Sequence, residues 1–174
     1  MKVEYPIKDY SEKYKALMQF NRNKSAFIHK WYPFVEGYSR EFIYEVLNEI
    51  NYHPRQALDP FSGSGTTPVE LQYLGINCHS FEVSPFMHLL STVKMYKGYR
   101  LKEFDLHLYS LKENVLRFKR DIRSKLSPPG YQTIEPKPGL EKWVFNRAVM
   151  EALLKLKYHI ERISDIKYRN LFKI

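Results

Sequence analysis

The chain has 174 residues, 44% of them hydrophobic, which is enough for one ordinary domain with its own core. Lys and Arg exceed Asp and Glu by 28 to 19, and the resulting net charge of +9 favours a polyanionic partner such as nucleic acid. No run approaches the ~20 apolar residues that cross a bilayer, and the start lacks the apolar core of a signal peptide, so we expect a cytoplasmic protein with no membrane partner.

The first 33 residues predict an arm followed by an aromatic loop. Residues 1–24 are polar and basic, with Tyr10, Tyr14, Leu17 and Met18 spaced for one side of a short helix. The segment from His29 to Pro33 reads H-K-W-Y-P, and its rings could cover a bound ligand. Its two basic side chains could pair with a ligand carboxylate, although ordinary packing explains the same segment.

Residues 39–51 predict an amphipathic helix with Ser39 as its N-cap. The apolar positions repeat at helical spacing and are Phe42, Ile43, Val46, Leu47 and Ile50. The following turn leads into an apolar strand over residues 55–59, which ends at Asp59.

A glycine-rich turn, a helix and a second strand follow, and together they predict a βαβ unit. Gly63 and Gly65 allow the tight turn. The spacing T-x-x-E from Thr67 predicts a capping box for a helix that begins at Pro68 and ends at Gly75. A second strand over residues 77–82 then ends at Glu82, and Ser84-Pro85 predicts the start of a further helix.

A glycine loop after one parallel strand and a carboxylate after the next face the same crevice of a sheet, which predicts a nucleoside site. The third glycine of a dinucleotide fingerprint is replaced by Pro68, and no phosphate-binding lysine lies between Pro60 and Thr92. Asp59 at the strand end favours an ammonium or sulfonium ligand. S-adenosylmethionine carries both cations.

The stretch D-P-F-S-G-S-G-T-T, from Asp59 to Thr67, resembles the cofactor-binding motif of the DNA methyltransferases that act on the amino groups of adenine (N6) or cytosine (N4). Residues 27–33 resemble the segment that packs over the methionine end of the cofactor in that family. Glu82 stands where the family usually has Asp as its ribose ligand. The resemblance is close over residues 25–95, and enzymes that methylate guanine in tRNA share a similar loop.

The crevice and the resemblance together imply S-adenosylmethionine as cofactor and DNA as partner. The expected cofactor-binding residues are His29, Lys30, Tyr32, Pro33, Asp59, Pro60, Phe61, Gly63, Gly65, Thr66, Thr67, Glu82 and Ser84.

The remaining sequence predicts helices. After the helix that ends near Gly98, apolar residues repeat at a three-four spacing over residues 101–122 and predict a long helix with a narrow seam. Its basic side chains either face solvent or lie along a DNA backbone; they are Lys102, Lys112, Arg117, Lys119, Arg120, Arg123 and Lys125. A last helix is predicted from about Asn146 through Ile163. No histidine pair has metal-ligand spacing, so no metal is expected.

The catalytic motif of the resembled family, [DNS]-P-P-[YFW], is missing. Ser127-Pro128-Pro129-Gly130 lacks the aromatic residue and follows a charged helical pattern, so we interpret it as a helix terminator and expect no catalytic residue in this chain. Two strands are also too few for a stable doubly wound sheet.

We therefore expect an incomplete α/β, Rossmann-like methyltransferase fold. Residues 1–100 would bind the cofactor, and residues 101–174 would be a helical extension. A second polypeptide or a downstream region would then carry the catalytic motif, as in a split or truncated restriction-modification enzyme. The alternatives are a tRNA or RNA methyltransferase and a non-catalytic nucleoside-binding subunit.

Overall fold

The computed structural model describes residues 9–34, 36–50, 52–119, 122 and 147–174. Their contacts divide into two compact units, one ending at Lys97 and one from Gly98 to Lys173, and each is described by itself. No helix among these residues is long and apolar enough to span a membrane.

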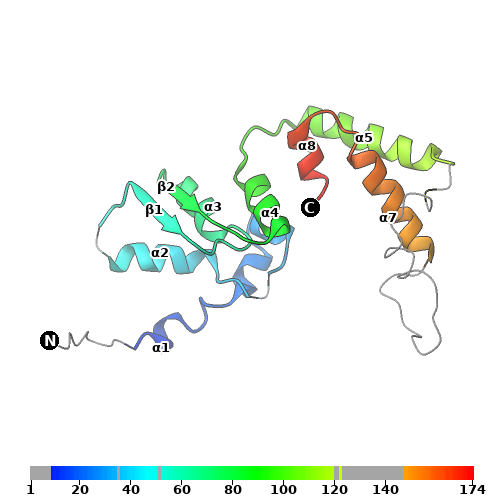
Figure 1. The fold of residues 1–174 in the computed structure, drawn as a ribbon. Coiled ribbons are helices and arrows are strands. Elements are labelled where there is room, and N and C mark those ends of the chain that lie inside the picture. The colour runs from blue at the N-terminus through cyan, green and yellow to red at the C-terminus, as the bar shows by residue number, and fades with distance from the viewer. Residues whose placement is uncertain (1–8, 35, 51, 120–121, 123–146) are drawn as a thin grey trace, which may run out of the picture. The chain divides into compact units, whose positions relative to one another are not determined.

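The first unit is built on two parallel strands, β1 (Gln56–Asp59) and β2 (Asn77–Ser80), in which Ala57 lies opposite Cys78. Helix α3 (Thr66–Tyr73) connects them, which confirms the predicted βαβ unit (Figure 1). The whole chain is thus a mixed helix and sheet protein, and its described residues form a two-stranded sheet.

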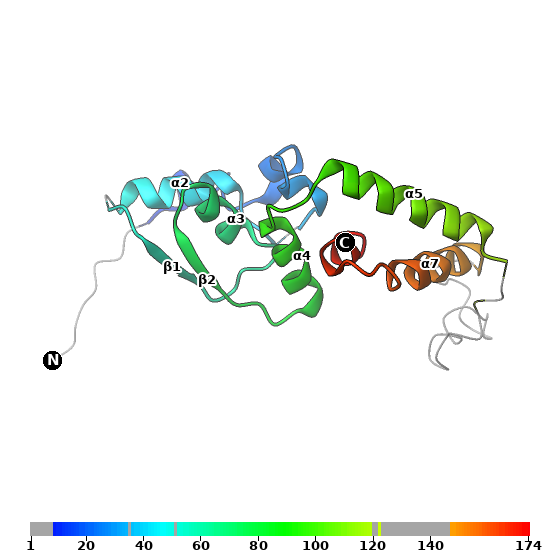
Figure 2. The ribbon, with the colours of Figure 1, turned by 90° about the horizontal axis from the view of Figure 1, so that it is seen from above.

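One face of this sheet is covered and the other is open. Helices α2 (Arg40–Glu49) and α3 lie behind the strands, and the described elements of this unit leave the opposite face bare (Figure 2). Burial follows the strand period of two, so Asp59 is buried while its neighbour Leu58 is 66% exposed. A large apolar side chain on an uncovered face indicates a surface that another element would stabilise.

Helix α3 begins earlier than the sequence predicts. Gly65, in the left-handed region at φ +86°, is its N-cap, and Thr66 and Thr67 already lie within the helix. The predicted capping box is therefore wrong: no side chain caps this end, and Glu70 makes other contacts. Gly75, at φ +72°, lies just past the C-terminal end, as predicted.

Helix α2 is confirmed, and Ser39 is its N-cap residue as predicted, but the Ser39 hydroxyl makes no capping bond. Instead Asn23, fully buried in the short helix η1 (Phe20–Lys24), accepts from the Arg40 amide at 3.0 Å and donates to the Tyr38 carbonyl at 2.9 Å. A residue 17 positions away thus accepts the hydrogen bond of a backbone amide that would otherwise be unpaired at the start of α2.

The other termini in this unit match the sequence more closely. Helix α4 (Pro85–Met95) begins as predicted, with the Ser84 hydroxyl accepting from the Met87 amide at 3.4 Å. The N-terminal helix is shorter than expected, because α1 covers only Ser11–Tyr14.

The second unit contains α5 (Leu101–Arg117), α7 (Arg147–Ile160) and α8 (Ile166–Leu171). Tyr168 is completely buried at its centre, where its hydroxyl accepts from the Arg100 amide at 2.9 Å and lies 2.9 Å from a Glu103 carboxylate oxygen. The predicted final helix is confirmed as α7, which ends three residues earlier than expected. A further short helix, α8, follows it, and the Asp165 side chain caps α8 by accepting from the Lys167 amide at 3.0 Å.

The predicted seam of the long helix is only partly correct. Leu111 and Ile122 are buried and Phe104, Val115 and Phe118 are half-buried, as expected, but Leu101 and Leu108 are exposed. The Ser127 to Gly130 segment and three of the predicted basic residues, Arg120, Arg123 and Lys125, lie outside the described residues.

Candidate functional site

The glycine loop between β1 and α3 lies against the residues that follow β2. The Ser62 amide donates to the Phe81 carbonyl at 3.0 Å, which extends the parallel pairing beyond the strands. The Glu82 carboxylate then accepts from the Gly63 amide at 2.8 Å and from the Ser84 amide at 2.8 Å. The structure therefore brings Gly63, Glu82 and Ser84 together at the carboxyl end of the sheet, as the βαβ pattern predicts.

Asp59 adds a second carboxylate at the same end. One of its oxygens, Oδ1, accepts from the Phe61 amide at 3.0 Å. The other, Oδ2, is buried and has no partner among the described residues. A buried carboxylate oxygen without a donor is costly, and a cationic N–H donor would satisfy it. Phe61 itself is 86% exposed, and Pro60 is exposed beside it.

Both glycines of the loop are required by close packing as well as by backbone conformation. Gly63 has φ +50°, and a Cβ atom there would lie 3.1 Å from the Phe34 ring. Gly65 has φ +86°, and its Cβ would lie only 2.7 Å from Cβ of Ser91 on α4. The loop is thus packed between an aromatic ring on one side and a helix on the other.

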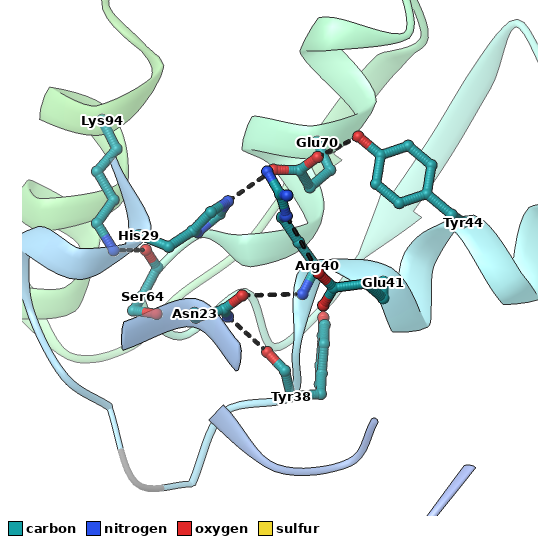
Figure 3. Close-up of polar contacts among 9 residues, drawn as sticks. All are labelled: Asn23, His29, Tyr38, Arg40, Glu41, Tyr44, Ser64, Glu70 and Lys94. Carbon is teal, nitrogen blue, oxygen red and sulfur yellow. Dashed lines mark hydrogen bonds and ion pairs between the residues drawn. The ribbon is translucent and has the colours of Figure 1, made fainter. Parts of the chain in front are cut away.

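A buried polar network joins the aromatic loop to α3. His29, fully buried in the short helix η2 (His29–Trp31), has its Nε2 2.7 Å from Oε1 of Glu70, whose Oε2 accepts from the Tyr44 hydroxyl (Figure 3). Burial raises the pKa of Glu70, but the hydrogen bonds from His29 and Tyr44 outweigh it and hold the pKa below its usual value. The bond to Glu70 raises the pKa of Tyr44 to about 12.

The backbone before His29 is strained. Ile28 has φ +68° and ψ −47°, and the His29 amide donates to the Phe27 carbonyl at 2.8 Å, which is the geometry of a γ-turn. A β-branched residue rarely adopts a positive φ, so the surrounding contacts must hold it there. The His29–Glu70 contact is one such contact.

The aromatic loop contributes differently from the prediction. His29 is fully buried against Glu70, whereas Lys30 and Pro33 are exposed. The Tyr32 ring packs edge-on against Phe86 at the start of α4, with 5.2 Å between ring centres.

The paired threonines lie in the first turn of α3, where they pack against other residues. Thr66 is buried, and the Thr67 hydroxyl bonds to the Tyr38 hydroxyl.

Lys94 on α4 also holds the loop, and the sequence analysis did not identify it. This residue of α4 is 2% exposed, and its Nζ donates to the Ser64 carbonyl at 2.9 Å (Figure 3). Burial lowers its pKa to about 8. The available signal was its position four residues after Leu90, on the apolar face of the helix. Phe34, which has no motif of its own, was missed as well, and Glu70 was assigned to a capping box instead of to the contact with His29.

No group of three or more His, Cys, Asp or Glu side chains that could hold a metal ion occurs within the described parts of the chain.

Two curated proteins resemble parts of this sequence. Type II methyltransferase M.BsoBI of Geobacillus stearothermophilus is 33% identical over 93 residues, which cover 52% of this chain and 18% of that protein. Type II methyltransferase M.MjaII of Methanocaldococcus jannaschii is 34% identical over 65 residues, which cover 37% of this chain and 12% of that protein. No protein-family profile and no solved structure matches. The chain spans less than a fifth of the length of either relative.

Proposed function

We propose that this chain, which is related to the Type II methyltransferases over about half of its length, is the S-adenosylmethionine-binding part of a DNA amino-methyltransferase acting on N6 of adenine or N4 of cytosine. The observation that carries the proposal is the placement of Glu82 on the Gly63 amide, 2.8 Å away, directly beside the D-P-F-S-G-S-G-T-T loop. This arrangement gives a nucleoside two carboxylates and a close backbone approach.

Asp59 and Glu82 divide the recognition of the cofactor between them. The unpartnered Oδ2 of Asp59 accepts from the ammonium group at the methionine end, while Glu82, fixed by two backbone amides, has lone pairs left for the ribose hydroxyls. Phe61 and Tyr32 provide apolar surface beside them. When bound, the cofactor supplies an activated methyl group on a sulfonium, and the protein contributes orientation and electrostatics.

His29 acts as a positioning residue in this proposal, because it is buried against Glu70. Lys30 is the basic residue of its segment that is exposed and available to the cofactor carboxylate. None of these side chains abstracts a proton or attacks the methyl group, so the residues that hold the target amino group lie elsewhere.

The catalytic motif and the rest of a Rossmann-like sheet belong to another region of the protein or to a second polypeptide. The exposed side chains at the crevice end of the sheet support this: Phe81 is 63% exposed and Val83 98% exposed. Two described strands with an uncovered face need further strands to be stable. The much greater length of both relatives agrees with this proposal.

Methyl transfer from labelled S-adenosylmethionine to duplex DNA and to tRNA tests the proposed substrate. We expect the chain, together with the part that carries the catalytic motif, to label duplex DNA at least about 100-fold faster than tRNA, because a groove shaped for one duplex fits the other poorly. Preferential labelling of tRNA would contradict the DNA assignment. Labelling of neither would leave a nucleoside-binding subunit without catalysis.

A further inference from the structure

The positive charge of this protein is concentrated in the second unit. Residues 98–174 contain 17 Lys and Arg against 9 Asp and Glu, whereas residues 1–97 contain 11 against 10. Almost all of the net charge of +9 therefore lies outside the part that contains the glycine loop. A local excess of this size attracts a polyanion to the helical unit.

A polar pocket lies between α5 and α7 in this unit. Its volume is about 600 Å³. The hydrogen-bonding side chains that line it come from both helices and the turn after α7: His107, Ser110, Asn114, His159, Arg162 and Ser164. The described lining contains no Asp or Glu, so no carboxylate in it neutralises Arg162.

Arg162 is held in place at the edge of this pocket. Its guanidinium lies 3.3 Å from the centre of the Tyr158 ring, and Nη1 donates to the Tyr158 carbonyl at 2.8 Å. No carboxylate among the described residues pairs with it. A stacked guanidinium loses little further freedom on binding, and its remaining N–H groups match the oxygens of a phosphate.

His159 provides a second donor without a partner. Its Nε2 is buried and makes no hydrogen bond to any described residue. Burial, and then the charge of Arg162, lower the pKa of His159, so its imidazole is neutral and has one N–H to donate. An anion that accepts from Nε2 would satisfy this buried atom.

We propose that the pocket between α5 and α7 binds a backbone phosphate of duplex DNA, with Arg162 and His159 as its principal donors. This inference rests on the proposed function for its choice of DNA. The pocket positions the duplex without reading its sequence, since phosphate contacts fix register and carry no base information.

Equilibrium binding of a fluorescent duplex over a range of salt concentrations tests the proposal. Arg162→Ala is expected to weaken binding about 5- to 10-fold at 0.1 M salt and to reduce the slope of log affinity against log salt by about 1. Lys112→Ala is the matched control, because it removes one charge from an exposed side chain of α5 outside the pocket. It should change the affinity less than about 2-fold.

Four further measurements decide between the remaining explanations: DNA binding by Arg162→Lys, binding of inorganic phosphate, binding of tRNA, and S-adenosylmethionine affinity. Arg162→Lys should keep the salt slope but lose part of the affinity, because lysine retains the positive charge but lacks the planar guanidinium that stacks on Tyr158. Equal losses for Arg162→Ala and Lys112→Ala, or no loss for Arg162→Ala, would overturn the proposal. Tight binding of inorganic phosphate, or stronger Arg162-dependent binding of tRNA than of DNA, would assign the pocket to another ligand. Unchanged S-adenosylmethionine affinity in all variants separates this outcome from failure of the cofactor site.

Discussion

Replacing Glu70 with alanine is expected to lower the free energy of unfolding by about 3 to 5 kcal/mol at pH 7. The change removes the hydrogen-bond partner of the fully buried His29 and of the Tyr44 hydroxyl, and it leaves a cavity. It also frees the strained backbone at Ile28. Urea denaturation followed by circular dichroism measures the loss. Glu45→Ala on the exposed face of α2 is the matched control and should cost less than about 1 kcal/mol.

The loss should also depend on pH. Because the pKa of Glu70 is lowered in the folded protein, its contribution is present above its ordinary value of 4.5 and is lost as the pH falls through the folded value. The difference between the wild type and Glu70→Ala should therefore shrink in acid. The double variant His29→Leu/Glu70→Leu should be more stable than Glu70→Ala, since it leaves no imidazole unpaired. A constant difference at all pH values would mean that the cavity alone causes the loss.

Gly65→Ala is expected to destabilise the protein by about 3 kcal/mol or more. The added methyl group meets Cβ of Ser91 at 2.7 Å and its Cα at 3.0 Å, in addition to the cost of φ +86°. Gly75→Ala isolates the backbone cost, because Gly75 has φ +72° and nothing within 4 Å of the added atom. It should cost about 1 kcal/mol.

Thermal unfolding of both glycine variants and of Gly65→Ala/Ser91→Gly separates the steric cost of the added methyl group from the cost of the backbone conformation. The double variant should regain part of the loss, because the closest atom is removed. If Gly65→Ala and Gly75→Ala are equally destabilising, α4 does not pack against the loop as described.

Local sequence signals predicted the elements around the site because short-range chemistry determines them. The strand end at Asp59, the cap at Ser84 and the stop at Gly75 each depend on neighbours within a few residues, whereas β2 ends at Ser80, two residues before the predicted end at Glu82. The crevice geometry followed from the handedness of the βαβ unit, which places both strand ends on one edge.

The buried polar contacts could not be predicted, because their partners lie far apart in the chain. Glu70 fits a capping box, yet its partner is His29, 41 residues earlier. Asn23 caps a helix that begins 17 residues later, and Lys94 reaches a carbonyl 30 residues away. The T-x-x-E spacing is compatible with either use, and only tertiary packing decides between them.

The seam of the long helix was largely predictable, because apolar spacing follows the helical period. The three-four spacing left out Leu106 and Leu116, which are exposed, but it did not show that Leu108 is also exposed. Packing against α7 and the end of α8, where Phe104 stacks on Phe172 and Phe118 contacts Tyr158, decides which seam residues are buried.

The central claim is that the chain forms a charge-matched pocket for a sulfonium nucleoside. Calorimetric titration of the wild-type and Asp59→Asn proteins tests it most directly. Two ligands are compared, S-adenosylmethionine and 5′-methylthioadenosine, which lacks the amino-acid end. The chain is titrated alone and together with the part that completes its sheet. Asp59→Asn should weaken S-adenosylmethionine binding at least about 30-fold, because the ammonium loses its charged acceptor, and should leave 5′-methylthioadenosine binding within about 2-fold. Equal effects on both ligands, or no binding of S-adenosylmethionine by the completed assembly, would contradict the account.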